Sequence, residues 1–283
     1  MMKRELVDAI VLPIYGIAIL LALRTAYESA WFQGIMSSHG SNVAKYCSLT
    51  LSFVVFWTHS LILMAIDNFR PEWAIKYKVQ ADKFVSSEMT VKGIRVALFN
   101  ILCIALPMSI VWNAVVLPWR GVDPDTPLPP WSRVIMDFAV FLLAVEVLFY
   151  YSHRIFHMKA FYATYHKMHH EFIAPIGVAA VYCTPLEMVI ANLLPLMAGP
   201  TIMGSHITTT TAWFCLALIN TVQTHSGYDF PFMASPRRHD FHHEAFTENF
   251  GVLGVLDTIH HTDTKFLARM EQEHQANLKP KAA

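Results

Sequence analysis

The sequence predicts an all-α integral membrane protein, folded as a multi-span helical bundle. Hydrophobic residues make up 54% of its 283 residues and charged residues only 15%, whereas soluble domains hold about 25% charged residues. Several stretches without formal charge are also long enough for a spanning helix, which takes about 20 mostly apolar residues. The net charge is zero, so we expect the lipid bilayer as a partner and no nucleic acid.

The candidate spans follow the uncharged stretches in order. Residues 9–23 form a short one, which Arg24 can lengthen by reaching the headgroup region. No small-residue cleavage site follows, so we expect a retained anchor rather than a signal peptide. The next three spans are residues 46–66, 96–119 and 134–151. Four scattered cysteines are expected to be small core residues, and not disulfides or metal ligands: Cys47, Cys103, Cys183 and Cys215.

The longest uncharged stretch predicts a helical hairpin. Residues 188–224 hold no formal charge over 37 residues, interrupted by Gly199-Pro200 and Gly204. Glycine and proline mark turns, so we expect the chain to cross, turn near residues 199–206 and return to the side from which it came.

The charges between the spans predict the orientation. The segment 67–92 is rich in lysine, and cytosolic loops of membrane proteins carry an excess of Lys and Arg. The loop 120–131 has no such excess and is expected to be lumenal, with both termini cytosolic. Arg24 and Lys45 then lie on the lumenal side, which is a mild misfit. The segment 67–92 is expected to lie along the membrane interface; an ordinary solvated loop is the alternative.

Eight of the 15 histidines fall into three short boxes at helical spacing. Residues i, i+3 and i+4 share one face of a helix, so each box is expected to aim its imidazoles in one direction. The predicted topology places all three boxes on the cytosolic side. Their members are His153 and His157; His166, His169 and His170; His239, His242 and His243.

Packing eight imidazoles together favours metal binding, because neutral rings bound to ions avoid the cost of crowded, buried charges. Eight ligands exceed the needs of one ion, so two ions are the natural number. Imidazole suits Zn, Cu, Fe and Ni alike, and the ligands alone do not name the metal. The fold prediction is therefore a multi-span bundle with a cytosolic, histidine-rich cap for two metal ions.

Nearby polar residues are candidates for contacts to the second ring nitrogen of the ligands. Glu146 is the foremost of them, because it precedes His153 by two helical turns and an ionisable group at membrane depth usually has a partner. Surface charge or a helix-end contact is the alternative for each. The other candidates are Asp229, Asp240 and His260.

These motifs resemble those of the fatty acid hydroxylase (sterol desaturase) superfamily of membrane di-iron enzymes. The resemblance covers roughly residues 130–265 and is carried by YYSHRIFH (150–157), YHKMHHEF (165–172), THSGYDFP (224–231) and HDFHHEAFTENFGVLGVLDTIHHTD (239–263). The H-x3-H spacing and HSGYDFP are closest to the C4-methylsterol oxidase and related sterol-acting branch. Where that family often has HGTD, this chain has His260-His261-Thr262-Asp263, which leaves the role of His261 open.

The resemblance implies an O2-dependent monooxygenase with two iron ions (Fe2+/Fe3+) that oxidises a C–H bond of a membrane lipid, a sterol in the first place. The chain has no flavin, nicotinamide or haem fingerprint, so the family implies an electron donor such as cytochrome b5 with its NAD(P)H reductase. The final KPKAA resembles a cytosolic retrieval signal of the endoplasmic reticulum membrane. The implied division is residues 1–92 for the N-terminal spans and basic loop, and 93–283 for the catalytic domain.

The same resemblance, together with position, predicts His225 as a ninth ligand. It lies where the hairpin returns to the boxes, and Gly227 and Pro231 allow the chain to turn there. The alternative is a cap at the end of the hairpin helix.

Three other functions stay open on the sequence alone. A fatty acyl or sphingoid-base hydroxylase or desaturase would use the same boxes. A metal transporter would spread its ligands across the depth of the membrane. The third is a non-catalytic metal-binding protein.

Overall fold

The computed structural model describes residues 2–278, and these form helices with no β-strand among them. Five of their helical stretches are long and apolar enough to cross a membrane, so the prediction of an all-α integral membrane protein is confirmed. All four predicted single spans match one of them, and only residue 9 of the first span lies outside. The five stretches are Ile10–Glu28, Asn42–Phe69, Ser87–Trp119, Trp131–Phe156 and Pro185–Met203.

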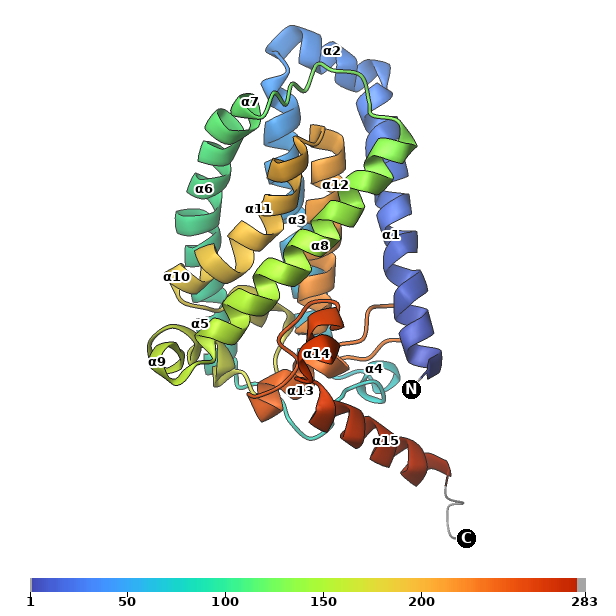
Figure 1. Cartoon of the computed structure of the whole chain (residues 1–283), viewed down its shortest axis with the longest axis vertical. Helices are drawn as coiled ribbons and strands as arrows, with labels where there is room; N and C mark the ends of the chain where they lie inside the picture. Colours follow the sequence, from blue (N-terminus) through green and yellow to red (C-terminus); the bar gives the residue numbers. More distant parts are fainter. Residues whose placement is uncertain (1, 279–283) are drawn as a thin grey trace.

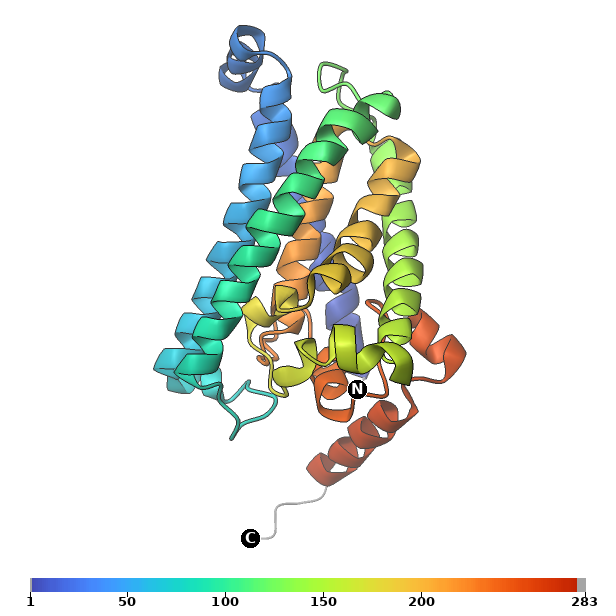
Figure 2. The same cartoon turned by 90° about the vertical axis from the view of Figure 1, so that its left-hand side faces the viewer.

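The spanning helices surround one inner helix, α12 (Ile207–Thr224) (Figures 1 and 2). α1 (Met2–Glu28) and α3 (Asn42–Phe69) pack against it, and α8 (Trp131–Phe156) packs along α11 (Leu194–Met203). The first half of α12 is buried, including four consecutive threonines at 208–211. Threonine hydroxyls inside a helix can bond to the backbone carbonyl one turn earlier, as that of Thr211 does to Ile207 O (2.7 Å).

The remaining elements connect these helices or cover one end of the bundle. α2 (Ala30–His39) links α1 and α3. A continuous helical stretch from α5 (Ser87–Phe99) to α7 (Leu117–Trp119) contains α6 (Leu106–Val111) and two π-helical segments. Short elements follow α8: α9 (Lys159–Phe161), a π-helix (Tyr162–His166), 3-10 turns (His169–Glu171, Gly177–Val181), α10 (Pro185–Glu187) and a π-helix (Met188–Leu193). After α12 come α13 (Arg237–Ala245), α14 (Val255–His260) and α15 (Thr264–Leu278).

The predicted hairpin is present, with its turn at the C-terminal end of the expected range. Gly204 closes α11 in the left-handed conformation (φ 57°), and His206 caps α12 by accepting a hydrogen bond from Thr208 N on its Nδ1 (3.1 Å). Gly199 and Pro200 do not form the turn but lie inside α11. Pro200 falls in a membrane helix, where lost backbone bonds are tolerated more easily when neighbouring helices pack around them.

Gly199 instead allows a close approach of two helices. A Cβ atom at this position would lie 2.7 Å from the Cα of Phe141 in α8, which is closer than such atoms approach. We therefore expect Gly199→Ala to force α8 and α11 apart and destabilise the protein by about 1–3 kcal/mol. Thermal unfolding in detergent checks this. Gly34→Ala is the control, because nothing lies within 4 Å of its Cβ position; equal melting of both variants and the wild type contradicts the packing argument.

The two ends of the bundle differ in content. The histidine segments, the start of α1, α4 (Glu72–Ile75) and α15 lie at one end, whereas α2, the loop before α8 and the α11–α12 turn lie at the other (Figure 1). The elements that the loop charges predict on the cytosolic side of the membrane thus lie together at one end of the bundle. Which end faces the cytosol stays a prediction, and the predicted KPKAA signal lies outside the described residues.

The orientation is testable with glycosylation acceptors, which are modified only in the lumen. We expect an acceptor inserted at residue 125 to be modified and one appended after residue 283 to stay unmodified, since the basic segment 67–92 lies at the same end of the bundle as α15, the last described helix. A mobility shift after glycosidase treatment measures this. The reverse pattern contradicts the orientation.

Part of the basic segment 67–92 packs against the rest of the protein, although many of its residues are exposed. Lys78 is buried and forms a 2.6 Å ion pair with Asp67, and it pairs in an isolated antiparallel bridge with Tyr228. Trp73 stacks on Phe230, with ring centroids 6.0 Å apart. These contacts tie the segment to residues 228–230, next to the histidines.

The prediction that all four cysteines are core residues is wrong for two of them. Cys183 and Cys215 are buried, but Cys47 and Cys103 are exposed on the outside of the bundle, and all four are free. In a membrane protein the outer surface is also apolar, so an apolar stretch does not identify the core.

Candidate metal centre

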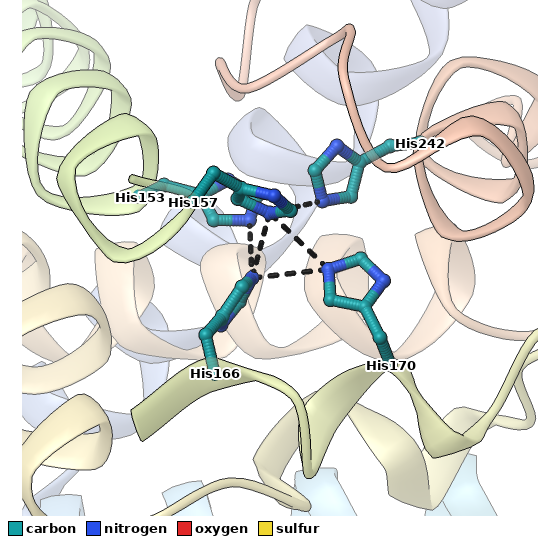
Figure 3. A group of neighbouring side chains, drawn as sticks. All are labelled: His153, His157, His166, His170 and His242. Atoms are coloured by element: carbon teal, nitrogen blue, oxygen red, sulfur yellow. Dashed lines mark hydrogen bonds between the residues drawn. The ribbon is translucent and has the colours of Figure 1, made fainter. Parts of the chain in front are cut away.

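Nine histidines converge at one end of the bundle, and they are the nine predicted as ligands. They come from the end of α8, the short helices after it, the end of α12, and α13. Each offers a ring nitrogen that lies within 4.8 Å of the others in its group. Group one is His153, His157, His166, His170 and His242 (Figure 3). Group two is His169, His225, His239 and His243.

The expectation that each box aims in one direction is wrong for two boxes. His166 and His170 belong to group one, but His169 joins group two. Likewise His239 and His243 belong to group two, whereas His242 joins group one. At 3.6 residues per turn, positions i and i+4 differ by about 40° and positions i+3 and i+4 by about 100°. The i, i+4 pairs therefore stay together, and the i+3 ring turns to the other group.

In group one the Nε2 atoms form a tight cage. The Nε2 of His166 lies 3.2 Å from that of His153, 2.8 Å from that of His157 and 3.0 Å from that of His170 (Figure 3). His242 completes the cage, with its Nε2 3.2 Å from that of His157.

Group two is built in the same way around His239. Its Nε2 lies 2.8 Å from the Nε2 of His225 and 3.1 Å from that of His243. The ring of His169 lies beside them, with centroids 4.7 Å from His243 and 5.4 Å from His225. Position near the end of the hairpin therefore brings His225 to the boxes, as expected.

In several rings the Nδ1 atom, which points away from the centre of its group, faces a hydrogen-bond acceptor and must therefore carry the proton. Nδ1 of His153 donates to Phe250 O (2.9 Å), that of His242 to Glu248 O (2.7 Å), and that of His225 to Thr221 O (2.8 Å). A carbonyl oxygen can only accept, so these Nδ1 atoms carry the proton. Their Nε2 atoms, when the rings are neutral, present lone pairs to the centre of each group.

This arrangement fits a cation in each group. The Nδ1 of His166 also faces the Glu187 carboxyl group, at 2.7 Å. When that group is ionised it can only accept, so the Nε2 atoms of His153 and His166, which lie 3.2 Å apart, both carry lone pairs and no proton is left to join them. Lone pairs converging on one point repel unless a positive ion lies between them, and neutral imidazole is a ligand of Fe, Zn, Cu and Ni.

Burial keeps the rings neutral. It lowers the pKa of His169 to about 4 and, with the neighbouring rings, that of His225 to about 3. Burial and crowding likewise lower the pKa of His157, His170 and the three histidines of α13. At neutral pH these rings hold their lone pairs ready for metal without competition from protons.

Comparison with known proteins places this site in a family. The sequence profile described as fatty acid hydroxylase matches residues 138–262, which include all nine histidines. A putative methylsterol monooxygenase of Dictyostelium discoideum is 30% identical over 253 residues, which cover 86% of this chain and 92% of that protein. The chain belongs to the fatty acid hydroxylase family. No solved structure matches it.

Two further relatives of this fatty acid hydroxylase family member are longer than the chain. Fatty acid hydroxylase domain-containing protein 2 of Homo sapiens is 43% identical over 215 residues, or 75% of this chain and 64% of that protein. A fatty acid hydroxylase of Mycosarcoma maydis is 36% identical over 200 residues, which cover 70% of this chain and 52% of that protein. The chain thus spans between half and two thirds of these two relatives.

Glu187 is a site residue of this family member that sequence reasoning missed. Its carboxylate is buried and accepts the Nδ1 proton of His166 (2.7 Å), and the side chain of Thr184 caps its backbone N–H. The signal was available, because Glu187 is the last charge before the uncharged stretch 188–224. The rule that an ionisable group at membrane depth has a partner applies to it as well as to Glu146.

Removal of the Glu187 contact is expected to lower activity by about 10–100-fold, because the carboxylate orients His166 and strengthens it as a ligand. Glu187→Leu removes both charge and acceptor, whereas Glu187→Gln keeps an acceptor and is expected to retain more activity and bound metal. Turnover and metal content of both variants check this. Glu244→Gln is the control, because that carboxylate pairs with Arg269 on the surface (2.6 Å); equal loss in all three variants contradicts the role.

Three of the residues predicted to support the ligands make other contacts. Glu146 accepts hydrogen bonds from the backbone N–H groups of Val252, Leu253 and Leu256, because two turns before His153 its side chain meets the loop before α14. Asp240 accepts from Gln80 (2.9 Å), and burial raises its pKa to about 6. His260 is bonded to Tyr151 (3.0 Å).

The fourth, Asp229, lies 3.9 Å from Arg237 at the start of α13. Its backbone N–H also donates to Tyr77 O (2.8 Å), beside the bridge that joins the basic segment to the chain after His225. This contact fixes the path of the chain between the two halves of group two.

A cavity of about 1640 Å³ opens onto the metal centre from the bundle. Most of its walls are apolar side chains of the spanning helices, from Leu20 in α1 to Phe138 in α8. Of the nine histidines only His225 and His239 line it. An apolar molecule in the cavity therefore meets group two, whereas no histidine of group one lines the cavity.

Proposed function

We propose that this protein is an O2-dependent di-iron monooxygenase that oxidises a C–H bond of a membrane lipid, with a sterol as the favoured substrate, in sterol or lipid biosynthesis. The observation that carries the proposal is the contact between the apolar cavity and the histidines of group two. A lipid in the cavity has its apolar body among the spanning helices and one end at His225 and His239. Membership of the fatty acid hydroxylase family supports the same reading.

The two histidine groups would hold one iron each, with five ligands in group one and four in group two. When bound, the irons would supply the redox chemistry for reducing O2 and oxidising an unactivated C–H bond. The chain itself supplies three things. It holds protons on the Nδ1 atoms, it presents the Nε2 lone pairs inward, and it keeps the rings buried so that bulk water stays out.

Support for a sterol comes from the methylsterol monooxygenase name of the Dictyostelium relative, which the chain matches over 92% of its length. The name of the Mycosarcoma relative supports the alternative, a fatty acyl or sphingoid-base hydroxylase or desaturase. The proposal includes a separate electron donor, such as cytochrome b5 with an NAD(P)H reductase. It places the protein in the endoplasmic reticulum membrane, with the catalytic face and both termini cytosolic.

The experiment is turnover of iron-loaded protein in nanodiscs with a chemical reductant and ¹⁸O₂, on a panel of 4-methylsterols and a panel of long-chain acyl and sphingoid lipids. We expect a sterol product that carries ¹⁸O, formed only with iron, reductant and O2 together. An oxidised acyl or sphingoid product in its place decides for the alternative. Iron-loaded protein that oxidises neither panel contradicts the proposal.

A further inference from the structure

The large cavity contains two carboxamides that the metal centre does not use. Asn192 and Asn220 both line it, and both are half-buried. The only contact of the Asn192 amide among the described residues is a weak one to the Cys183 thiol, with its Nδ2 3.9 Å from the sulfur. No hydrogen bond of the Asn220 side chain is found among them. An amide in an apolar cavity costs free energy unless it finds a partner.

Both amides lie at a similar depth from the metal centre. Asn220 precedes the ligand His225 by five residues on α12, and Asn192 follows Glu187, the partner of His166, by five residues. At 1.5 Å per residue each amide is roughly 7 Å along its helix from a residue of the metal centre. Asn192 also lies in a π-helical segment (Met188–Leu193), a departure from the α-helix that is frequent at functional sites.

Beyond the amides the cavity is mainly apolar. Leu20 in α1, Val134 and Phe138 in α8 and Phe214 in α12 line its deeper part. Two serines also line the cavity, Ser52 in α3 and Ser109 in α6. The Ser52 hydroxyl is already paired, since it donates to Ser48 O (2.9 Å). The cavity therefore offers, in order from the metals, a polar region, two amides and a mainly apolar chamber. Besides the two histidines, the polar region is lined by Thr221, Thr224, Ser235, Arg238 and Thr258.

We propose that Asn192 and Asn220 bind the polar group of the substrate, a hydroxyl or carbonyl, and so select lipids that are oxidised within a few bonds of that group. This inference rests on the proposed function and names the substrate class of the same site. With its polar group on the amides, a lipid has its tail in the apolar chamber and its polar end toward group two. The tail end cannot reach the metals in this orientation.

The test is equilibrium binding to iron-loaded protein in nanodiscs, with empty nanodiscs as background, and it needs no turnover. Two probe pairs distinguish the two sources of such a polar group: a 4-methylsterol against its 3-deoxy counterpart, and octadecan-1-ol against octadecane. We expect the wild type to prefer the alcohol of at least one pair by roughly fivefold or more, the effect of one or two hydrogen bonds. The pair that shows the preference tells whether the ligand is a sterol or an acyl lipid.

The variants are Asn192→Leu, Asn220→Leu and the double variant, which keep the volume of the side chain approximately. We expect each single variant to reduce the preference and the double variant to abolish it, with iron content unchanged. Asn220→Ser, which restores a hydrogen-bonding group, is expected to recover part of the preference. Asn68→Leu, the same substitution at an exposed residue of α3 outside the cavity, is the matched control that leaves the preference intact. A wild type that binds both members of both pairs equally, or a double variant that keeps the preference, overturns the inference. If the binding preference follows the amides but no lipid is oxidised, only the proposed reaction fails.

Discussion

Replacing His242 with alanine is expected to lower lipid oxidation by more than about 100-fold and to remove iron, while the protein stays in the membrane. Loss of a residue that only supports a ligand costs about 10–100-fold, and removal of a ligand costs more. The Nε2 of His242 completes group one, 3.2 Å from that of His157. His169→Ala is expected to have the same effect through group two. Turnover and iron content per chain are the measurements.

The control for both variants is His39→Ala. His39 is exposed at the end of α2, at the opposite end of the bundle, and its Nδ1 lies 3.3 Å from Ile35 O. We expect it to keep activity and iron. Turnover of His242→Ala or His169→Ala within a few-fold of the wild type contradicts the metal centre.

Replacing His225 with lysine is expected to abolish activity and to empty group two of metal. A protonated lysine cannot coordinate, and its charge would lie among His169, His239 and His243. The position of His225 suits both roles that the sequence left as alternatives, since it ends α12 with its Nδ1 on Thr221 O (2.8 Å) and has its Nε2 2.8 Å from that of His239. A capping role alone tolerates a cation near a helix C-terminus, but a ligand role does not.

His206→Gln, at the other end of α12, is the matched control. It replaces the N-cap imidazole of the same helix, far from the metal groups, and is expected to leave metal content unchanged. A His225→Lys protein that is active and contains both metals shows that His225 is only a cap.

Spacing in the sequence predicted which histidines gather, but not how they divide. The hydropathy of residues 188–224 predicted the hairpin that returns His225 to the boxes, and the i, i+4 pairs of each box stay together as helical geometry requires. Helical angles separate the i+3 ring of a box from its i, i+4 pair, but which rings of different boxes share a group depends on the positions of α13 and of the turns around His169 in the fold. Those positions are set by tertiary contacts such as the donation from His169 Nδ1 to Tyr182 O (3.2 Å), which no local pattern encodes.

The supporting carboxylate shows a second limit. Glu146 and Glu187 both lie at the depth of the membrane and both have partners, as their cost requires. Sequence distance favoured Glu146, which lies two turns before His153. Its partners are backbone N–H groups of residues 252–256, however, whereas Glu187 reaches His166 from another helix. The rule predicts that a buried charge has a partner, and only the fold decides which.

The most direct test of the central claim, that nine histidines form two iron sites, is the iron content and ⁵⁷Fe Mössbauer spectrum of protein purified and loaded without oxygen. We expect two irons per chain in two distinct nitrogen-rich environments, with His242→Ala and His169→Ala each losing a different one. The claim is contradicted if the wild type binds no iron. It is also contradicted if the wild type binds a single iron that both His242→Ala and His169→Ala retain.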